Sequence, residues 1–182
     1  MNSLTDEQIM IEVKKGNKEL FNIILDRYYK SILNYSYRLI GNKELAEDAT
    51  QEIFSRMYFA ANKYQPTAPF RIFLYTIAYR ESLKLLKKRK NYSLIENFYN
   101  IASKDNPSTD LEKKYISLLL RQAILKLSPK YRVAIILREY NGLSYEEISQ
   151  VLKCSLPNTK NYILRAKSKL KEILIPALRG AL

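Results

Sequence analysis

Apolar residues recur at every third or fourth position along most of the chain, which is the spacing of one face of an α-helix. A first helix is predicted to begin after Thr5, because Thr5 and Gln8 have the spacing of a capping box, and to stop near Gly16. A longer helix covers about residues 18–40 and stops at Gly41, since glycine readily takes the left-handed backbone that ends a helix. No stretch alternates as a β-strand would, so the pattern predicts an all-α protein.

Two more helices are predicted in the first half of the chain. Asn42 can cap the third helix, and the proline pair Pro66 and Pro69 interrupts the pattern after it. A fourth helix then runs from Phe70 to about Lys90. In the third helix apolar side chains recur at every fourth position and leave the polar residues between them on another face; the apolar positions are Leu45, Ala49, Ile53 and Met57.

The helical pattern fades in a polar segment at about residues 91–110. Asparagine, serine, aspartate and one proline dominate this segment, as is typical of a connection between domains. We therefore predict two small helical domains, at residues 1–92 and 111–182, joined by a flexible linker at residues 93–110.

The second half contains the same kinds of helix-start signals as the first. One helix is predicted from Thr109 to Leu127, and Ser128 with the proline after it begins the next. Ser144 and Glu147 form a second capping box, which opens a short helix. A final basic helix covers about residues 157–174.

The net charge and the absence of certain residue types exclude several classes of function. Lys and Arg number 31 against 18 Asp and Glu, a net charge of +13 that attracts polyanions such as nucleic acid. No apolar run of about 18 residues could span a bilayer and no signal peptide is visible, so we expect a cytoplasmic protein with no membrane partner. The chain has no His, and its single cysteine is Cys154. Zinc sites of the Cys/His type, a Ser-His-Asp triad and an internal disulfide are therefore excluded, and we expect no cofactor, no metal and no catalytic residue.

Residues 143–170 have the proportions of a helix-turn-helix, with a short helix, a tight turn and a longer basic helix. In this motif the second helix enters the major groove, the groove that shows a distinct edge for each base pair. Its inward stripe is predicted to be Ile163, Ala166 and Leu170. The alternative is a surface hairpin whose lysines are merely solvated, but the combination of features favours DNA binding. Many such turns have glycine where this chain has Lys153, which would be strained in a left-handed conformation.

Three segments, in this order, carry a family resemblance: LAEDATQEIF at 45–54, PFRIFLYTIAYRESLKLLKKRK at 69–90 and LSPKYRVAIILREYNGLSYEEISQVL at 127–152. Together they resemble domains two and four of the extracytoplasmic-function (ECF) group of bacterial sigma factors. The resemblance covers nearly the whole chain apart from the linker. It implies a non-catalytic protein that docks on core RNA polymerase and reads promoter DNA, as a duplex upstream and as a melted strand downstream. An anti-sigma factor is a further partner that it implies.

The resemblance also implies three groups of site residues. Core polymerase binding would fall to Asp48, Gln51, Glu52 and Ser55. The downstream promoter element would be held by Tyr64, Gln65, Thr67, Arg71, Tyr75, Arg80 and Lys84. The upstream element would be read by Ser155, Asn158, Lys160, Asn161, Leu164 and Arg165. The downstream role suits these residue types, because cations hold the phosphates and aromatic rings hold the unstacked bases of single-stranded DNA.

Other interpretations stay open at this stage. The first group could be a solvated polar face, and the segment 64–69 could be an ordinary connection containing prolines. Departures from the family pattern at Arg80, Pro157 and Tyr162 leave the promoter sequence open. A LuxR-like duplex-binding regulator is the main alternative function, and a helical RNA-binding or scaffolding protein is another. A metal-dependent nuclease would need a second carboxylate cluster beside that of the third helix.

Overall fold

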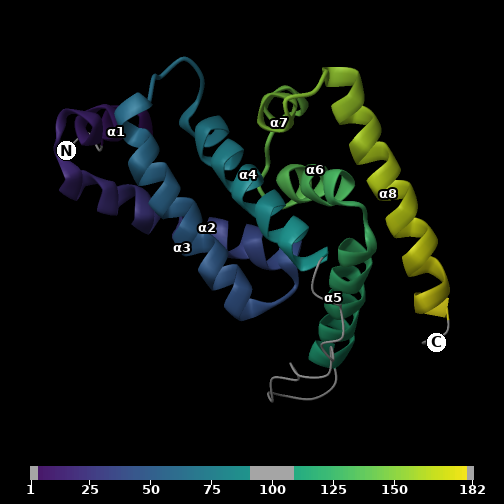
Figure 1. The fold of residues 1–182 in the computed structure, drawn as a ribbon. Helices are drawn as coiled ribbons and strands as arrows, with labels where there is room; N and C mark the ends of the chain where they lie inside the picture. The colour runs from purple at the N-terminus through teal and green to yellow at the C-terminus, as the bar shows by residue number, and fades with distance from the viewer. Residues whose placement is uncertain (1–3, 91–108, 180–182) are drawn as a thin grey trace.

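The computed structural model describes residues 4–90 and 109–179, and all regular structure in these two ranges is helical (Figure 1). The predicted all-α class is therefore confirmed. The predicted linker falls mostly on residues 91–108, outside the described ranges. The second half begins with a helix that starts at Thr109, slightly before the domain start predicted at residue 111.

Two helices of the first half begin where local capping signals predicted them. Thr5 Oγ1 accepts a hydrogen bond from the Gln8 amide at 3.3 Å, and Gln8 Oε1 accepts one from the Thr5 amide at 2.9 Å, which confirms the first capping box. The Asn42 side chain accepts from the Leu45 amide at 2.9 Å and so caps the third helix as predicted. The elements are α1 (Asp6–Lys15), a 3-10 turn η1 (Lys18–Leu20), α2 (Phe21–Ile40), α3 (Lys43–Ala60), a 3-10 turn η2 (Ala61–Lys63) and α4 (Phe70–Lys90).

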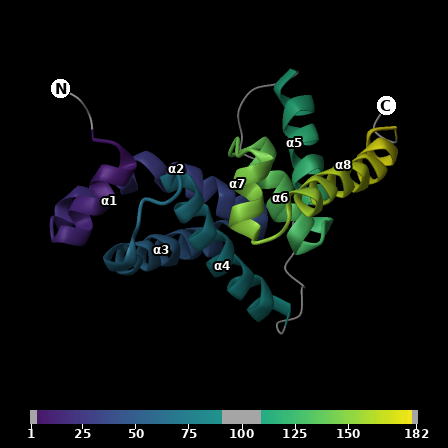
Figure 2. The ribbon, with the colours of Figure 1, turned by 90° about the horizontal axis from the view of Figure 1, so that it is seen from above.

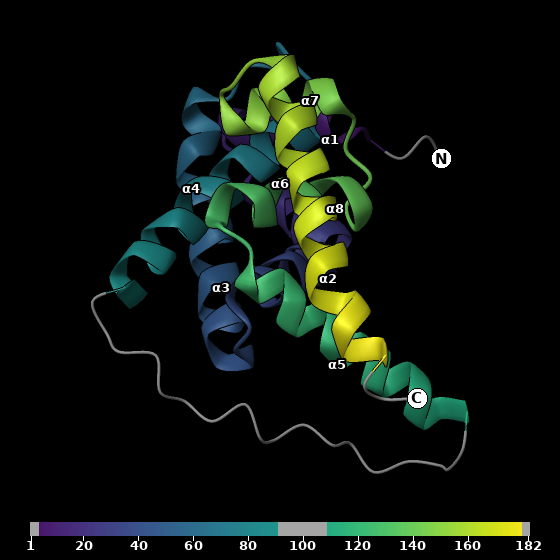
Figure 3. The same ribbon diagram turned by 90° about the vertical axis from the view of Figure 1, so that its right-hand side faces the viewer.

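In the described part of the second half, residues 109–179, the helices are α5 (Thr109–Lys126), α6 (Pro129–Glu139), α7 (Tyr145–Leu152) and α8 (Leu156–Arg179). The capping box of Ser144 and Glu147 is present, as predicted. Lys153 takes the left-handed conformation, with φ 52° and ψ 51°. The helix α8 is longer than predicted and continues through Pro176. It packs against α5, α6 and α7, so tertiary contacts support it, and Figure 3 shows it crossing the outer surface.

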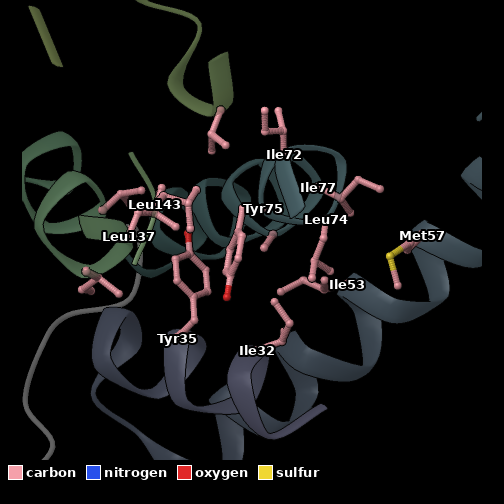
Figure 4. Close-up of a cluster of buried hydrophobic side chains, with 14 of the residues drawn as sticks. Ile32, Tyr35, Ile53, Met57, Ile72, Leu74, Tyr75, Ile77, Leu137 and Leu143 are labelled. Carbon is pink, nitrogen blue, oxygen red and sulfur yellow. The ribbon is translucent and has the colours of Figure 1, made fainter. Parts of the chain in front are cut away.

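The two halves pack against each other. The helix α4 contacts α7, and α2 contacts both α5 and α6. One continuous hydrophobic core therefore includes Tyr35 and Tyr75 from the first half and Leu137 and Leu143 from the second (Figure 4). The approach is close at Gly41, where an added Cβ would lie 2.6 Å from Leu125 Cδ1. The sequence predicted two domains but not this interface between them.

Candidate polymerase and nucleic-acid interfaces

The outer face of α3 presents all four residues predicted to bind polymerase. Asp48, Gln51, Glu52 and Ser55 are exposed, while Ala49, Ile53 and Met57 on the opposite face are buried. Glu52 accepts a hydrogen bond from Arg56 Nε at 2.6 Å, and both side chains stay about half exposed.

The exposed face of α3 continues beyond the predicted residues to Phe59, one helical turn after Ser55. The side chain of Phe59 is 71% exposed, which is unusual for so large an apolar group. Phe59 was not among the site residues predicted from the sequence. The sequence did contain a sign of it. Phe59 is an apolar residue four positions after Ser55, so the helical spacing puts it on the polar face of this helix and not on the buried face.

The loop after α3 has one buried end and an exposed centre. Tyr64 is only 2% exposed, and its ring packs edge-on against Phe73, with the ring centroids 5.0 Å apart. Burial raises the pKa of Tyr64 to about 12. The next polar residues, Gln65 and Thr67, are exposed. Lys14 Nζ donates to the Tyr64 carbonyl at 2.9 Å, so α1 holds this end of the loop in place.

The predicted downstream residues of α4 lie on two faces. Arg80 and Lys84 are exposed and one turn apart, and Lys84 pairs with Glu81 at 2.7 Å. Arg71 and Tyr75 instead face the second half of the chain.

A polar seam joins Arg71 and Tyr75 to the second half. Arg71 Nε lies 3.1 Å from a carboxylate oxygen of Glu147, and the Arg71 guanidinium also donates to the Asn141 carbonyl at 3.2 Å. The Asn141 side-chain amide donates to the Tyr75 hydroxyl at 2.8 Å, and Ser31 shares that hydroxyl at 2.9 Å. Tyr75 is 4% exposed, and burial raises its pKa. In this arrangement neither ring face of Tyr75 is open to a base.

Two arginines of the second half donate hydrogen bonds to carbonyl groups at the C-terminal end of α2. Arg132 donates to the Leu39 carbonyl at 2.7 Å, and burial lowers its pKa. Arg121 donates to the Gly41 carbonyl and stacks on the Tyr37 ring at 4.0 Å. The last carbonyls of a helix lack partners within it and attract cations, so these contacts stabilise α2 as well as the interface.

The helix-turn-helix has a buried side and an open side. Ile148 and Val151 of α7 meet the core together with Ile163 and Ala166 of α8. The helix α8 lies on the side of the molecule opposite α1 (Figure 2), and its start carries the predicted upstream residues. All of them are exposed: Ser155, Asn158, Lys160, Asn161, Leu164 and Arg165. Within the residues that the structure describes, the side chains of Asn161 and Arg165 make no hydrogen bond or ion pair.

Within residues 4–90 and 109–179 the structure offers neither a metal-binding cluster nor a membrane-spanning helix. No group of three or more Cys, Asp and Glu side chains there could hold a metal ion. No helix in those ranges combines the length and the apolar character needed to cross a membrane.

Comparison with known proteins gives the class of this fold. Residues 24–92 match the family model of sigma-70 region 2, and residues 117–170 match that of sigma-70 region 4. The chain is 32% identical over 150 residues to RNA polymerase sigma factor YlaC of Bacillus subtilis, covering 80% of this chain and 87% of the relative. It is 30% identical over 174 residues to ECF RNA polymerase sigma factor SigW of B. subtilis, covering 90% and 93%. RNA polymerase sigma-H factor of Pseudomonas aeruginosa is 27% identical over 187 residues, which cover 97% of each chain.

Solved structures share the fold. CnrH, in its complex with the cytosolic domain of CnrY, superposes with a TM-score of 0.70 at 23% identity, over 93% of this chain and 96% of CnrH. RpoE of Bartonella quintana, in its complex with the anti-sigma factor NepR, gives 0.69 at 24% identity, over 85% and 96%. The two matched regions define a sigma-70-type transcription initiation factor. Within that class, the chain belongs to the ECF group of RNA polymerase sigma factors. The LuxR-like alternative is not favoured.

Proposed function

We propose that this sigma factor binds core RNA polymerase through the outer face of α3 and directs initiation by reading two promoter elements. The helix α8 reads the upstream element as duplex. The loop after α3 and the exposed side of α4 hold the melted downstream strand. The exposed basic face of α8 in a complete helix-turn-helix is the observation that carries this proposal. The factor works in the cytoplasm with the polymerase, which performs the chemistry.

The downstream role requires the two halves to separate. Arg71 and Tyr75 are engaged with Asn141 and Glu147 in the polar seam, so they become available only when α7 leaves α4. Docking on polymerase supplies the energy for this separation and then fixes the distance between the two halves. Two weak sites held at a fixed distance bind cooperatively, because binding at one raises the effective concentration of the other.

Two residues fit the downstream role differently from the others. Tyr64 is buried, so we assign it to holding the loop while Gln65 and Thr67 face the DNA. Tyr75 can offer its ring to a base only in the separated state.

We also propose an anti-sigma factor as a regulator of this chain, supported by the structure of RpoE with NepR.

The α3 face is tested by reversing its charge. Asp48→Lys combined with Glu52→Lys is expected to abolish capture of core RNA polymerase in a pull-down, because two exposed carboxylates become repulsive cations. Circular dichroism should show an unchanged helix content, since both side chains are on the surface. The matched control is Glu19→Lys with Asp26→Lys, two exposed carboxylates outside α3. Undiminished capture by the α3 variant would contradict the assignment.

The α8 face is tested through salt. Lys160→Ala with Arg165→Ala should weaken binding of the reconstituted holoenzyme to upstream duplex. It should also reduce the slope of log affinity against log salt by up to about 2, since each phosphate contact contributes about 0.9. Lys18→Ala with Lys30→Ala removes the same charge from exposed positions of the first half. An unaltered slope in the α8 variant, or an equal change in the control, would refute the role of these two residues.

A further inference from the structure

Leu164 lies among polar residues on the outer face of α8 and is 67% exposed. At about 100° per residue, the direction opposite the buried Ile163 and Ala166 is that of Asn161. Leu164 lies about 60° to one side of Asn161 and Arg165 about 40° to the other. These three side chains therefore form a strip that points away from the protein.

The strip lies in the part of α8 that would meet bases. In a helix-turn-helix the N-terminal residues of the second helix contact base edges. Asn161 and Leu164 are within the first three turns of α8, and their Cα positions differ by about 4.5 Å along the helix axis. That offset is close to the spacing of about 3.4 Å between base pairs, so neighbouring base pairs fall under neighbouring side chains.

A single exposed leucine on a protein surface is ordinary, and its exposure alone has no meaning. The position of Leu164 is what matters. It lies beside the polar Asn161, on a helix whose apolar core stripe is complete without it, because Ile163 and Ala166 are both buried. An apolar side chain there cannot pair with phosphates or with the polar edges of bases.

One apolar group is available in the major groove. Each base pair shows hydrogen-bond donors and acceptors there, and thymine adds its C5-methyl group. We propose that Leu164 reads the C5-methyl group of a thymine in the upstream promoter element and so sets part of the base sequence that this factor selects. The inference rests on the proposed function, because it requires α8 to lie in the major groove of promoter DNA.

The test begins with the wild-type factor reconstituted with core RNA polymerase. Selection from a duplex library randomised in the upstream region gives the preferred sequence. Each thymine of that sequence, on either strand, is then replaced by deoxyuridine, which removes only the methyl group. At one position we expect the affinity to fall about three- to fivefold, the effect of one methyl group losing a buried contact. At the other positions deoxyuridine should have little effect.

The variant Leu164→Ala connects that methyl group to this side chain. Leu164 is exposed, so the variant is expected to fold normally, and it should bind the thymine and deoxyuridine duplexes equally. In the control Arg165→Ala the affinity falls but the difference between the two duplexes persists. A wild-type factor that responds to no methyl group, or a methyl effect that survives in Leu164→Ala, would overturn the inference while leaving the proposed function intact. Failure of the holoenzyme to select any upstream sequence would overturn both.

Discussion

Among single residues, Lys153 in the turn between α7 and α8 has a strained backbone. Lys153 is the only non-glycine residue with positive φ in the ranges that the structure describes. This conformation costs an L-residue about 1–2 kcal/mol, of which glycine avoids most but loses about 0.5–1 kcal/mol through its freer unfolded chain. Lys153→Gly should therefore raise the free energy of unfolding by about 0.5–1 kcal/mol in urea titrations.

Lys153→Ala separates backbone strain from charge. It removes the same ammonium group but keeps a Cβ, so its free energy of unfolding should stay within about 0.5 kcal/mol of the wild type. A glycine variant that is less stable than the alanine variant by about 0.5–1 kcal/mol would show that the left-handed backbone carries no measurable strain. The sequence indicated this residue, because glycine is common at this point of the motif.

Buried aromatic residues show the limit of sequence analysis at this scale. In the sequence, Tyr64 and Tyr75 look like base-stacking residues, because each is an aromatic residue near cationic residues. The structure places both in the core, at 2% and 4% exposure. A helical pattern identifies the buried face of α4 only if its packing partners are known, and α4 packs on α2 and α3 on one side and α7 on another. With partners on several sides, its apolar residues do not form one clear stripe.

At the scale of elements, two serines that stand at helix starts have different roles. Ser144 Oγ accepts from the Glu147 amide at 3.1 Å, and Glu147 accepts from the Ser144 amide at 2.7 Å. Ser128 stands at the start of α6 but makes no side-chain cap bond. Ser144→Ala should therefore lower the free energy of unfolding by about 1 kcal/mol, the usual loss of an N-cap. Ser128→Ala should lower it by only a few tenths, and equal losses in urea titrations would contradict this difference.

Helix boundaries were predictable where their cause is local. Capping boxes and the glycine after α2 depend on residues within one turn, so the sequence contains them in full. The end of α8 was not predictable, because Pro176 normally argues against a continuing helix. The helix nevertheless continues through Pro176, and α8 as a whole packs against α5 and α6, contacts between parts of the chain that lie far apart in sequence.

At the scale of the whole molecule, the interface between the two halves left no trace in the sequence. The hydrogen bond from Arg71 to Asn141 joins residues 70 positions apart, and that from Asn141 to Ser31 spans 110 positions. Neither periodicity nor spacing reports such pairs. The same interface explains why exposed and covered members of the predicted downstream group occur on one helix, since α7 covers one side of α4 and leaves Arg80 and Lys84 open.

The polar seam is expected to control how often the two halves separate. Its bonds are incomplete: Asn141 Oδ1 is buried and has no hydrogen-bond partner. Removing Asn141 and Arg71 together, by Asn141→Ala and Arg71→Ala, deletes the bonds to Tyr75 and Glu147 but leaves the capping box of α7 in place. The loss is about 1–2 kcal/mol, which corresponds to a roughly five- to thirtyfold higher ratio of separated to closed molecules.

Single-molecule energy transfer measures this ratio even when the separated state is rare. Dyes at Glu19→Cys and Lys171→Cys, in a Cys154→Ser background, place one exposed label in each half. The seam variant should show more low-transfer molecules than the unmodified seam. Arg56→Ala, which removes an ion pair within α3 alone, should show no change.

Added salt should raise the low-transfer fraction of the wild type more than that of the seam variant. Salt screens the half-exposed pair of Arg71 and Glu147, and the variant lacks this pair. Identical distributions for the seam variant and the wild type would mean that apolar packing alone holds the halves together.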